Sequence, residues 1–213
     1  MKRQERALKI AKILQKLYPK PTIPLEHESP YTLLIAVLLS AQCTDKRVNE
    51  VTPFLFKKAN TPKKMVKLSI DQIQEIIKPC GLSKTKAKAI HLLSEMLLED
   101  FDGTVPNTFE ELEKFPGVGH KTASVVMAQA FKIPAFPVDT HIYRCARRWG
   151  LSRSKTVKGV EEDLKKLYPK KKWIDLHLQI IYCAREFCQA RGHKEDMCPI
   201  CKWLIEVDPK VLM

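Results

Sequence analysis

Apolar residues recur at intervals of three and four positions along almost the whole chain, and this spacing restricts the fold more than any other feature. It places apolar side chains on one face of an α-helix, whereas a half-buried strand needs strict alternation, which is nearly absent. The clearest runs are Val48, Val51, Phe54 and Leu55, then Ile70, Ile73, Ile76 and Ile77, then Ile90, Leu93 and Leu97. We therefore expect an all-α fold of about ten short helices.

Glycine and proline positions suggest how these helices are grouped. Gly81, Gly103 and Gly150 each follow a periodic segment, where the left-handed residue after a helix end usually stands. The segment YTLLIAVLLSAQ (31–42) is apolar on every face and predicts a buried central helix. The proline-rich PAFPVD (134–139) cannot continue a helix. We expect a six-helix lobe over 22–133 and a second helical lobe formed by 1–21 plus 134–213.

The charge balance favours a polyanionic partner. The 37 Lys and Arg residues exceed the 24 Asp and Glu residues, which gives a net charge of +13 and makes nucleic acid the first partner to consider. A basic surface that serves only solubility is the alternative. The N-terminus lacks the continuous apolar segment of a secretory signal, and the apolar run 33–39 is far shorter than the roughly 20 residues of a membrane span. We expect a soluble, cytoplasmic monomer, associated with the nucleoid in a bacterium.

The stretch KFPGVGHKTA (114–123) predicts a tight turn between two helices, a helix-hairpin-helix. Gly117 and Gly119 permit positive φ, so backbone N–H groups of the turn, that of Val118 included, can face an anion such as phosphate. A plain interhelical turn is the alternative. Lys121 follows at the helix start, where the helix dipole disfavours a cation by up to about 1 kcal/mol. The same potential favours a neutral, nucleophilic amine, although Lys121 could also merely contact phosphate.

Four segments in order resemble the endonuclease III family of helix-hairpin-helix DNA glycosylases: LLSAQCTD (38–45), CGLSKTKAKAI (80–90), ELEKFPGVGHKTASVV (111–126) and FPVDTHIYR (136–144). The resemblance implies a two-lobed fold with a DNA-binding cleft between the lobes. It also implies a base-excision repair enzyme that removes oxidised pyrimidines from damaged double-stranded DNA and cleaves the abasic site by β-elimination through a lysine Schiff base. Two alternatives remain, an 8-oxoguanine-type glycosylase/lyase and a non-catalytic helix-hairpin-helix DNA-binding module.

The resemblance also assigns roles to single residues. Lys121 is the nucleophile, and Asp139 stabilises the developing sugar cation and helps to activate the lysine, while its local pattern predicts a helix N-cap. Gln42 and Leu82 fill the space that a flipped base leaves in the duplex; a polar helix-end cap is the alternative for Gln42. Leu82 stands beside lysines and is poorly placed for a core. Plausible phosphate contacts are Lys84, Lys86, Lys88, Arg144, Arg147 and Arg148.

The seven cysteines form two groups. Cys43, Cys80 and Cys145 stand singly in apolar periodic segments and predict buried free thiols. The others, Cys183, Cys188, Cys198 and Cys201, lie near the C-terminus, where the resembled family binds a [4Fe-4S] cluster through four cysteines. Cys188, Cys198 and Cys201 match three of them, but nine rather than six residues separate the first two, and Val207 stands at the place of the fourth.

Three interpretations of this cysteine segment stay open. A [4Fe-4S] cluster needs a fourth ligand, and Cys183, Asp208 or an exogenous group could supply it. Cys183 can join only if its helix ends before Cys188. Zinc could be bound by the four cysteines, or by cysteines with His193. In the third interpretation the segment binds no metal.

Overall fold

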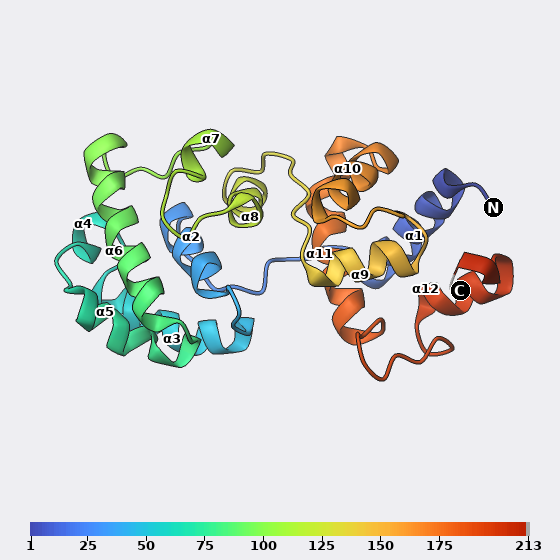
Figure 1. Ribbon diagram of the computed structural model, residues 1–213, viewed down its shortest axis with the longest axis horizontal. Coiled ribbons are helices and arrows are strands. Elements are labelled where there is room, and N and C mark those ends of the chain that lie inside the picture. Colours follow the sequence, from blue (N-terminus) through green and yellow to red (C-terminus); the bar gives the residue numbers. More distant parts are fainter. Residues whose placement is uncertain (212–213) are drawn as a thin grey trace. The chain divides into compact units, whose positions relative to one another are not determined.

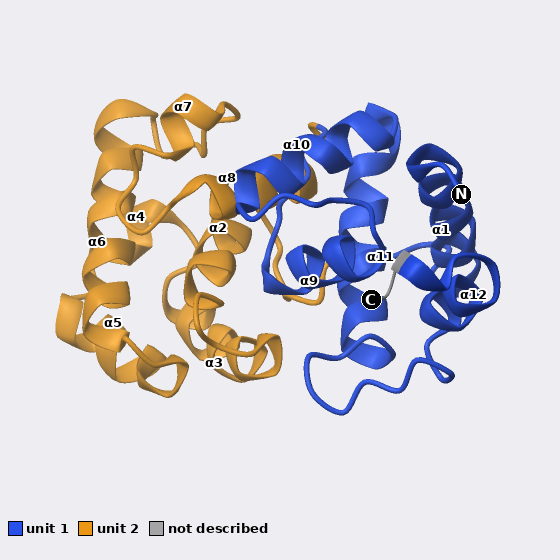
Figure 2. Ribbon diagram, turned by 45° about the vertical axis from the view of Figure 1, so that its right-hand side comes forward, with its two compact units in different colours: residues 1–22, 134–213 blue, residues 23–133 orange. Residues whose placement is uncertain are grey.

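The computed structural model describes residues 1–211 and divides the chain into two compact units, shown in different colours in Figure 2. Unit 2 is the continuous segment 23–133, and unit 1 combines residues 1–22 with the chain from residue 134 onward. Within the described residues all regular structure is helical, in twelve α-helices and three short 3-10 helices. The expectation of an all-α fold is confirmed. The expected number of helices was slightly low, because two of the α-helices are only four residues long.

Unit 2 is built around the helix α2, Pro30–Leu39, whose residues after Pro30 are all buried. The prediction of a buried central helix is confirmed. Helices α3, α6 and α8 pack against it. The other elements of this unit, coloured from light blue to green in Figure 1, are α3 (Asp45–Lys58), α4 (Pro62–Met65), α5 (Ile70–Ile77), η1 (Lys78–Cys80), α6 (Ser83–Asp100), α7 (Phe109–Leu112) and α8 (His120–Ala130).

The helix N-termini of unit 2 are of two kinds. A serine or threonine side chain accepts a hydrogen bond from a backbone N–H at the start of α2, α3, α4, α5 and α7. By contrast α6 begins after Leu82 and α8 after Gly119, and neither receives a side-chain cap. The first N–H groups of these two helices therefore lack the side-chain acceptor that the other helices of the unit have.

Unit 1 joins the two ends of the described chain. Its elements are α1 (Arg3–Leu17), α9 (Thr140–Arg148), α10 (Val157–Leu167), η2 (Lys170–Lys172), α11 (Trp173–Glu186), α12 (Pro199–Val207) and η3 (Pro209–Val211). The N-terminal helix α1 packs against α11 and α12, as Figure 1 shows at the blue and red ends of the chain. The side chains of Phe136 and Trp149 are completely buried in the core of the unit.

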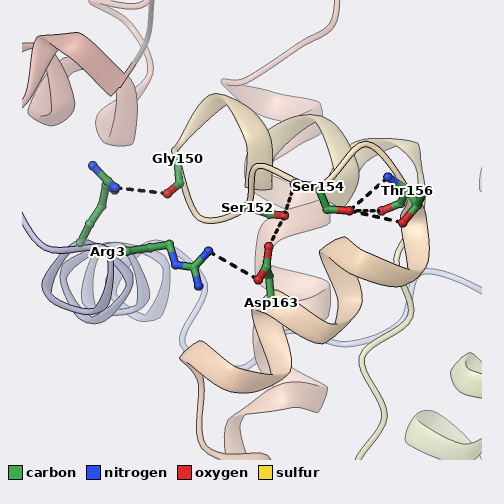
Figure 3. Close-up of polar contacts among 7 residues, drawn as sticks. Arg3, Gly150, Ser152, Ser154, Thr156 and Asp163 are labelled. Carbon is green, nitrogen blue, oxygen red and sulfur yellow. Dashed lines mark hydrogen bonds and ion pairs between the residues drawn. The ribbon is translucent and has the colours of Figure 1, made fainter.

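Polar contacts fasten α1 to the middle of unit 1 (Figure 3). Arg3 Nη1 lies 3.4 Å from Asp163 Oδ1. The hydroxyl of Ser152 donates to Asp163 Oδ2 at 2.6 Å, and it accepts a hydrogen bond from the backbone N–H of Ser154 at 3.1 Å. Asp163 on α10 thus links the first helix of the chain to the loop after α9.

No helix in the described part of the chain combines the length and apolarity needed to cross a membrane.

Candidate active site and cysteine cluster

The glycine turn joins α7 to α8, and two features of its first glycine, Gly117, disfavour any residue with a side chain. Gly117 adopts a φ of +79°, which disfavours residues with a Cβ. A Cβ at this position would also lie 3.2 Å from Leu38 Cδ1 and 3.3 Å from Ala89 Cβ. Backbone conformation and packing against α2 and α6 therefore both require glycine here.

The second part of the turn differs from the expectation. Gly119 has a φ of −96° and serves as the N-cap of α8 in an extended conformation, so positive φ was the wrong reason for a glycine there. The N–H of Val118 donates to the Phe115 carbonyl at 3.1 Å, and the Val118 side chain is buried. Because the turn already uses this N–H, an anion would have to bind the uncapped first turn of α8 instead.

Lys121 is the second residue of α8 and is exposed to solvent. The residue before it, His120, stacks on Phe109 with ring centroids 5.3 Å apart, and its Nδ1 lies 2.8 Å from Glu113 Oε1. These contacts fix the beginning of α8 against α7. Lys121 therefore lies in the uncapped first turn of α8, at the positive end of the helix dipole.

Asp139 is the N-cap of α9, as its local pattern predicts. Its Oδ1 accepts a hydrogen bond of 2.8 Å from the backbone N–H of Ile142, and the residue is half-buried. Asp139 belongs to unit 1 and Lys121 to unit 2. The cap fixes one carboxylate oxygen at the start of a helix, and a catalytic role for Asp139 stays a prediction.

Gln42 and Leu82 share an uncommon backbone conformation. Both are exposed residues with positive φ, 54° for Gln42 and 50° for Leu82. This region costs a residue with a Cβ about 1–2 kcal/mol. The side chain of Leu82 is 56% exposed, as expected for a leucine outside the core. The C-cap of α2 is Ser40, so Gln42 lies beyond the helix end.

The three lysines at the start of α6 differ in their exposure to solvent. Lys84 and Lys88 are exposed, and they stay predicted phosphate contacts. Lys86 is only 4% exposed, and its ammonium group donates hydrogen bonds to three backbone carbonyls of its own unit. The interpretation of Lys86 as a phosphate contact is therefore wrong. One sequence signal was overlooked: Lys86 lies on the same helix face as Ile90, Leu93 and Leu97.

The three arginines of α9 hold unit 1 together. Arg144 donates from Nε and Nη2 to the Cys188 carbonyl at 3.1 and 3.0 Å, and from Nη2 to the Ala184 carbonyl at 3.2 Å. Arg148 Nη1 lies 3.3 Å from the sulfur of Cys188. Arg147 donates to the Ser154 carbonyl at 3.0 Å. Phosphate binding by these arginines, Arg144 in particular, would have to coexist with the contacts that hold the cysteine segment.

Four metal-ligating side chains converge in that segment. The sulfur atoms of Cys188, Cys198 and Cys201 and a ring nitrogen of His193 all lie within 4.8 Å of one another. Helix α11 ends at Glu186, before Cys188, and Cys198 is the N-cap of α12. All three cysteines are buried.

His193 has the hydrogen bonding of a metal ligand. Its Nδ1 lies 3.0 Å from the Phe187 carbonyl, which can only accept a hydrogen bond, so Nδ1 carries the proton. Its Nε2 is buried without a hydrogen-bond partner. A backbone carbonyl that fixes the tautomer in this way leaves the lone pair of the other nitrogen for a metal ion.

Two further cysteines border this group. The thiol of Cys183 is hydrogen-bonded to Cys198, and that of Cys145 to Cys188. Hydrogen bonds from Cys145, Cys198 and Cys201 lower the pKa of Cys188. Cys145 is thus a buried thiol, as expected, but it does not stand alone. Nothing in the sequence indicated this contact, because it depends on the packing of α9 against α11.

Asp208 is engaged elsewhere. Its Oδ2 lies 2.9 Å from Arg6 Nη1 and 3.4 Å from the amino terminus. Because Asp208 is paired with the largely buried Arg6, its carboxylate does not serve as the fourth metal ligand.

Proteins named endonuclease III have a similar sequence and the same fold. Endonuclease III of Escherichia coli (strain K12) is 42% identical over 204 residues, which cover 94% of this chain and 97% of that protein. Endonuclease III of Bacillus subtilis (strain 168) is 42% identical over 185 residues, 86% of this chain and 84% of that protein. A structure described as a trapped endonuclease III-DNA covalent intermediate superposes with a TM-score of 0.90 at 39% identity, over 94% of each chain.

These likenesses extend over nearly the whole chain and include both units. Residues 35–170, which contain the hairpin, Lys121 and Asp139, match the family described as HhH-GPD superfamily base excision DNA repair protein. The chain therefore belongs to the HhH-GPD superfamily of base excision DNA repair proteins.

Proposed function

We propose that this protein is a bifunctional DNA glycosylase and abasic-site lyase that removes oxidised pyrimidines from duplex DNA, with Lys121 as the nucleophile. The observation that carries the proposal is the position of Lys121, directly after the glycine turn and in the uncapped first turn of α8. Relatives named endonuclease III that match almost the whole chain support it.

In this mechanism the neutral amine of Lys121 attacks C1′ of the damaged nucleotide, and the base leaves with the electrons of the glycosidic bond. The sugar ring opens, and the amine and C1′ form a Schiff base. Loss of a C2′ proton then expels the 3′ phosphate, which cleaves the strand. Asp139 stabilises the positive charge that develops on the sugar as the base departs.

The DNA contacts of the proposal come from two kinds of group. The uncapped N-termini of α6 and α8 offer backbone N–H groups to phosphate oxygens. Gln42 and Leu82 enter the duplex where the base has left it. Lys84 and Arg144 add positive charge along the backbone.

Borohydride reduction of the Schiff base tests this function. The parent protein and Lys121→Gln are incubated with duplexes that contain an abasic site, an oxidised pyrimidine or 8-oxoguanine. Lys114→Gln is the matched control, because Lys114 is an exposed lysine of the same hairpin. We expect Lys121→Gln to lose trapping and strand cleavage while it binds abasic DNA within a few-fold of the parent, since one cationic contact among many is lost.

The other outcomes of this experiment distinguish the alternative functions. Undiminished trapping by Lys121→Gln would place the nucleophile elsewhere. A parent protein that binds DNA but is never trapped would be a non-catalytic binding module. Preference for 8-oxoguanine over the oxidised pyrimidine would favour the other glycosylase class.

We also propose that Cys188, His193, Cys198 and Cys201 bind one tetrahedral metal ion, with zinc as the best fit. The segment between the first two cysteines is longer than the [4Fe-4S] pattern requires, and His193 lies in it. Ligand atoms within 4.8 Å of one another suit a single ion with Zn–S distances of about 2.3 Å. In a four-iron cluster each thiolate binds a different iron, which keeps the ligands further apart. Four protein ligands leave no open position, so the ion's role is structural.

Metal analysis of anaerobically purified protein tests this site. We expect about one zinc per chain, lost in His193→Ala but kept in His27→Ala, a histidine of unit 2. Iron with acid-labile sulfide would instead show a cluster, and protein without metal would show that the segment is held by packing alone.

A further inference from the structure

The side chain of Lys86 lies inside unit 2 and connects two loops that are far apart in the sequence. Its Nζ donates to the Leu39 carbonyl at 2.8 Å, to the Ala41 carbonyl at 2.8 Å and to the Cys80 carbonyl at 2.9 Å. Leu39 and Ala41 belong to the end of α2 and the loop after it, whereas Cys80 ends η1. One ammonium group therefore binds the backbone of both loops.

This arrangement satisfies a charge that would otherwise be costly to bury. An ammonium group has three N–H donors, and all three have a carbonyl partner here. The Leu39 carbonyl lies at the C-terminal end of α2, the negative end of its dipole, which favours a cation. Burial lowers the pKa of Lys86. Because every acceptor is a backbone atom, the bonds fix the path of the chain.

The two loops contain the strained residues of the proposed site. Gln42 follows Ala41 directly, and Leu82 stands two residues after Cys80. Their left-handed backbone conformations persist only where surrounding contacts determine them. The thiols of Cys43 and Cys80 add a second contact, a hydrogen bond between the same two loops.

We propose that Lys86 is a positioning residue that holds Gln42 and Leu82 in one fixed arrangement, so that both enter the duplex together when the damaged base is extruded. This inference rests on the proposed function of those two residues. Lys86 itself touches neither DNA nor the reacting atoms. Loss of its bonds should therefore impair the opening of a base pair and leave the chemistry of Lys121 intact.

The test compares two substrates. Lys86→Met keeps the length of the side chain and removes all three hydrogen bonds, and Lys63→Met, at an exposed lysine of α4 in the same unit, is the control. We expect Lys86→Met to lower excision of an oxidised pyrimidine from duplex DNA at least about tenfold. Borohydride trapping on a single-stranded oligonucleotide with one abasic site, where no base pair has to open, should stay near the parent level.

A double-mutant cycle separates positioning from general destabilisation. If Lys86 acts through the two loops, Lys86→Met should change duplex excision little in a Gln42→Ala/Leu82→Ala background. A further tenfold loss in that background, or an equal loss on both substrates, would overturn the inference. Absence of trapping by the parent on duplex abasic DNA would overturn the proposed function instead.

A second variant covers the case in which Lys86→Met does not fold. Lys86→Arg keeps the charge, but its planar guanidinium cannot aim at three converging carbonyls as an ammonium does. We expect folded protein, shown by a cooperative melting curve, with duplex excision below that of the parent. Unchanged duplex excision by a folded Lys86→Arg variant would overturn the proposal.

Discussion

Arg6 and Asp208 form an ion pair with 2.9 Å between Nη1 and Oδ2, although 202 positions separate them in the chain. Arg6 is a largely buried residue of α1, and its Nη2 also donates to the Gly150 carbonyl at 3.2 Å. Asp208 directly follows α12. The pair therefore joins α1, the first helix of the chain, to the C-terminal end of α12, the helix that contains Cys201. Within unit 1, the contact connects the N-terminal helix to the C-terminal segment.

Asp208→Asn should lower the free energy of unfolding by about 2 kcal/mol, because it leaves the largely buried guanidinium of Arg6 without its anion. Urea unfolding followed by circular dichroism measures this change. Glu75→Gln is the control, since the Glu75 and Lys78 side chains are mostly exposed and their pair should contribute almost nothing. A stability equal to the parent's in Asp208→Asn would mean that packing alone closes the unit.

Asp139→Asn separates capping from catalysis. Asparagine caps a helix about as well as aspartate, so thermal stability should stay within about 1 kcal/mol of the parent. Excision of an oxidised pyrimidine should fall by orders of magnitude, because the proposed mechanism uses the negative charge of Asp139 to stabilise the developing sugar cation. Asp139→Ala should lose about 1 kcal/mol of stability as well. An Asn variant with parental activity would reduce Asp139 to a cap.

The two glycines of the hairpin should respond differently to alanine. Gly117→Ala should destabilise the protein by more than about 1 kcal/mol, since its φ is +79° and the new Cβ would press against Leu38 and Ala89. Gly119→Ala should leave stability nearly unchanged, because no atom lies within 4 Å of its Cβ position. It should weaken binding to abasic DNA, since the methyl group would stand at the start of α8. Equal melting temperatures for the two variants would mean that neither the positive φ nor the close packing at Gly117 requires glycine.

Replacement of Cys198, a ligand of the proposed metal site, should affect stability and DNA binding more than the chemistry of Lys121. We expect Cys198→Ser to lower the melting temperature and to weaken DNA binding through the neighbouring basic residues Arg191 and Lys194. Trapping through Lys121 at saturating DNA should persist, because Lys121 belongs to unit 2. Met197→Ser is the control, because Met197 is an exposed neighbour of Cys198 outside the proposed ligand set. A Cys198→Ser variant that melts with the parent would show that the cysteines bind no stabilising metal.

The sequence by itself determined the helical class, the central helix α2 and the glycine turn. These features depend on local spacing. An entirely apolar segment has to be buried, and Ser29 directly before Pro30 is a sequence pattern that caps the start of a helix. The same holds for Asp139, whose capping bond spans only three residues.

Only the tertiary structure decided which polar groups meet across the fold. Lys86 resembles its exposed neighbours in the sequence, and its three acceptors come from segments up to 47 positions away. The sequence offers His193 as one possible zinc ligand, and the end of α11 and the start of α12 bring its ring to Cys188, Cys198 and Cys201. Helical periodicity predicts which face of a helix is buried, but it contains no information about which distant backbone or side chain that face will contact.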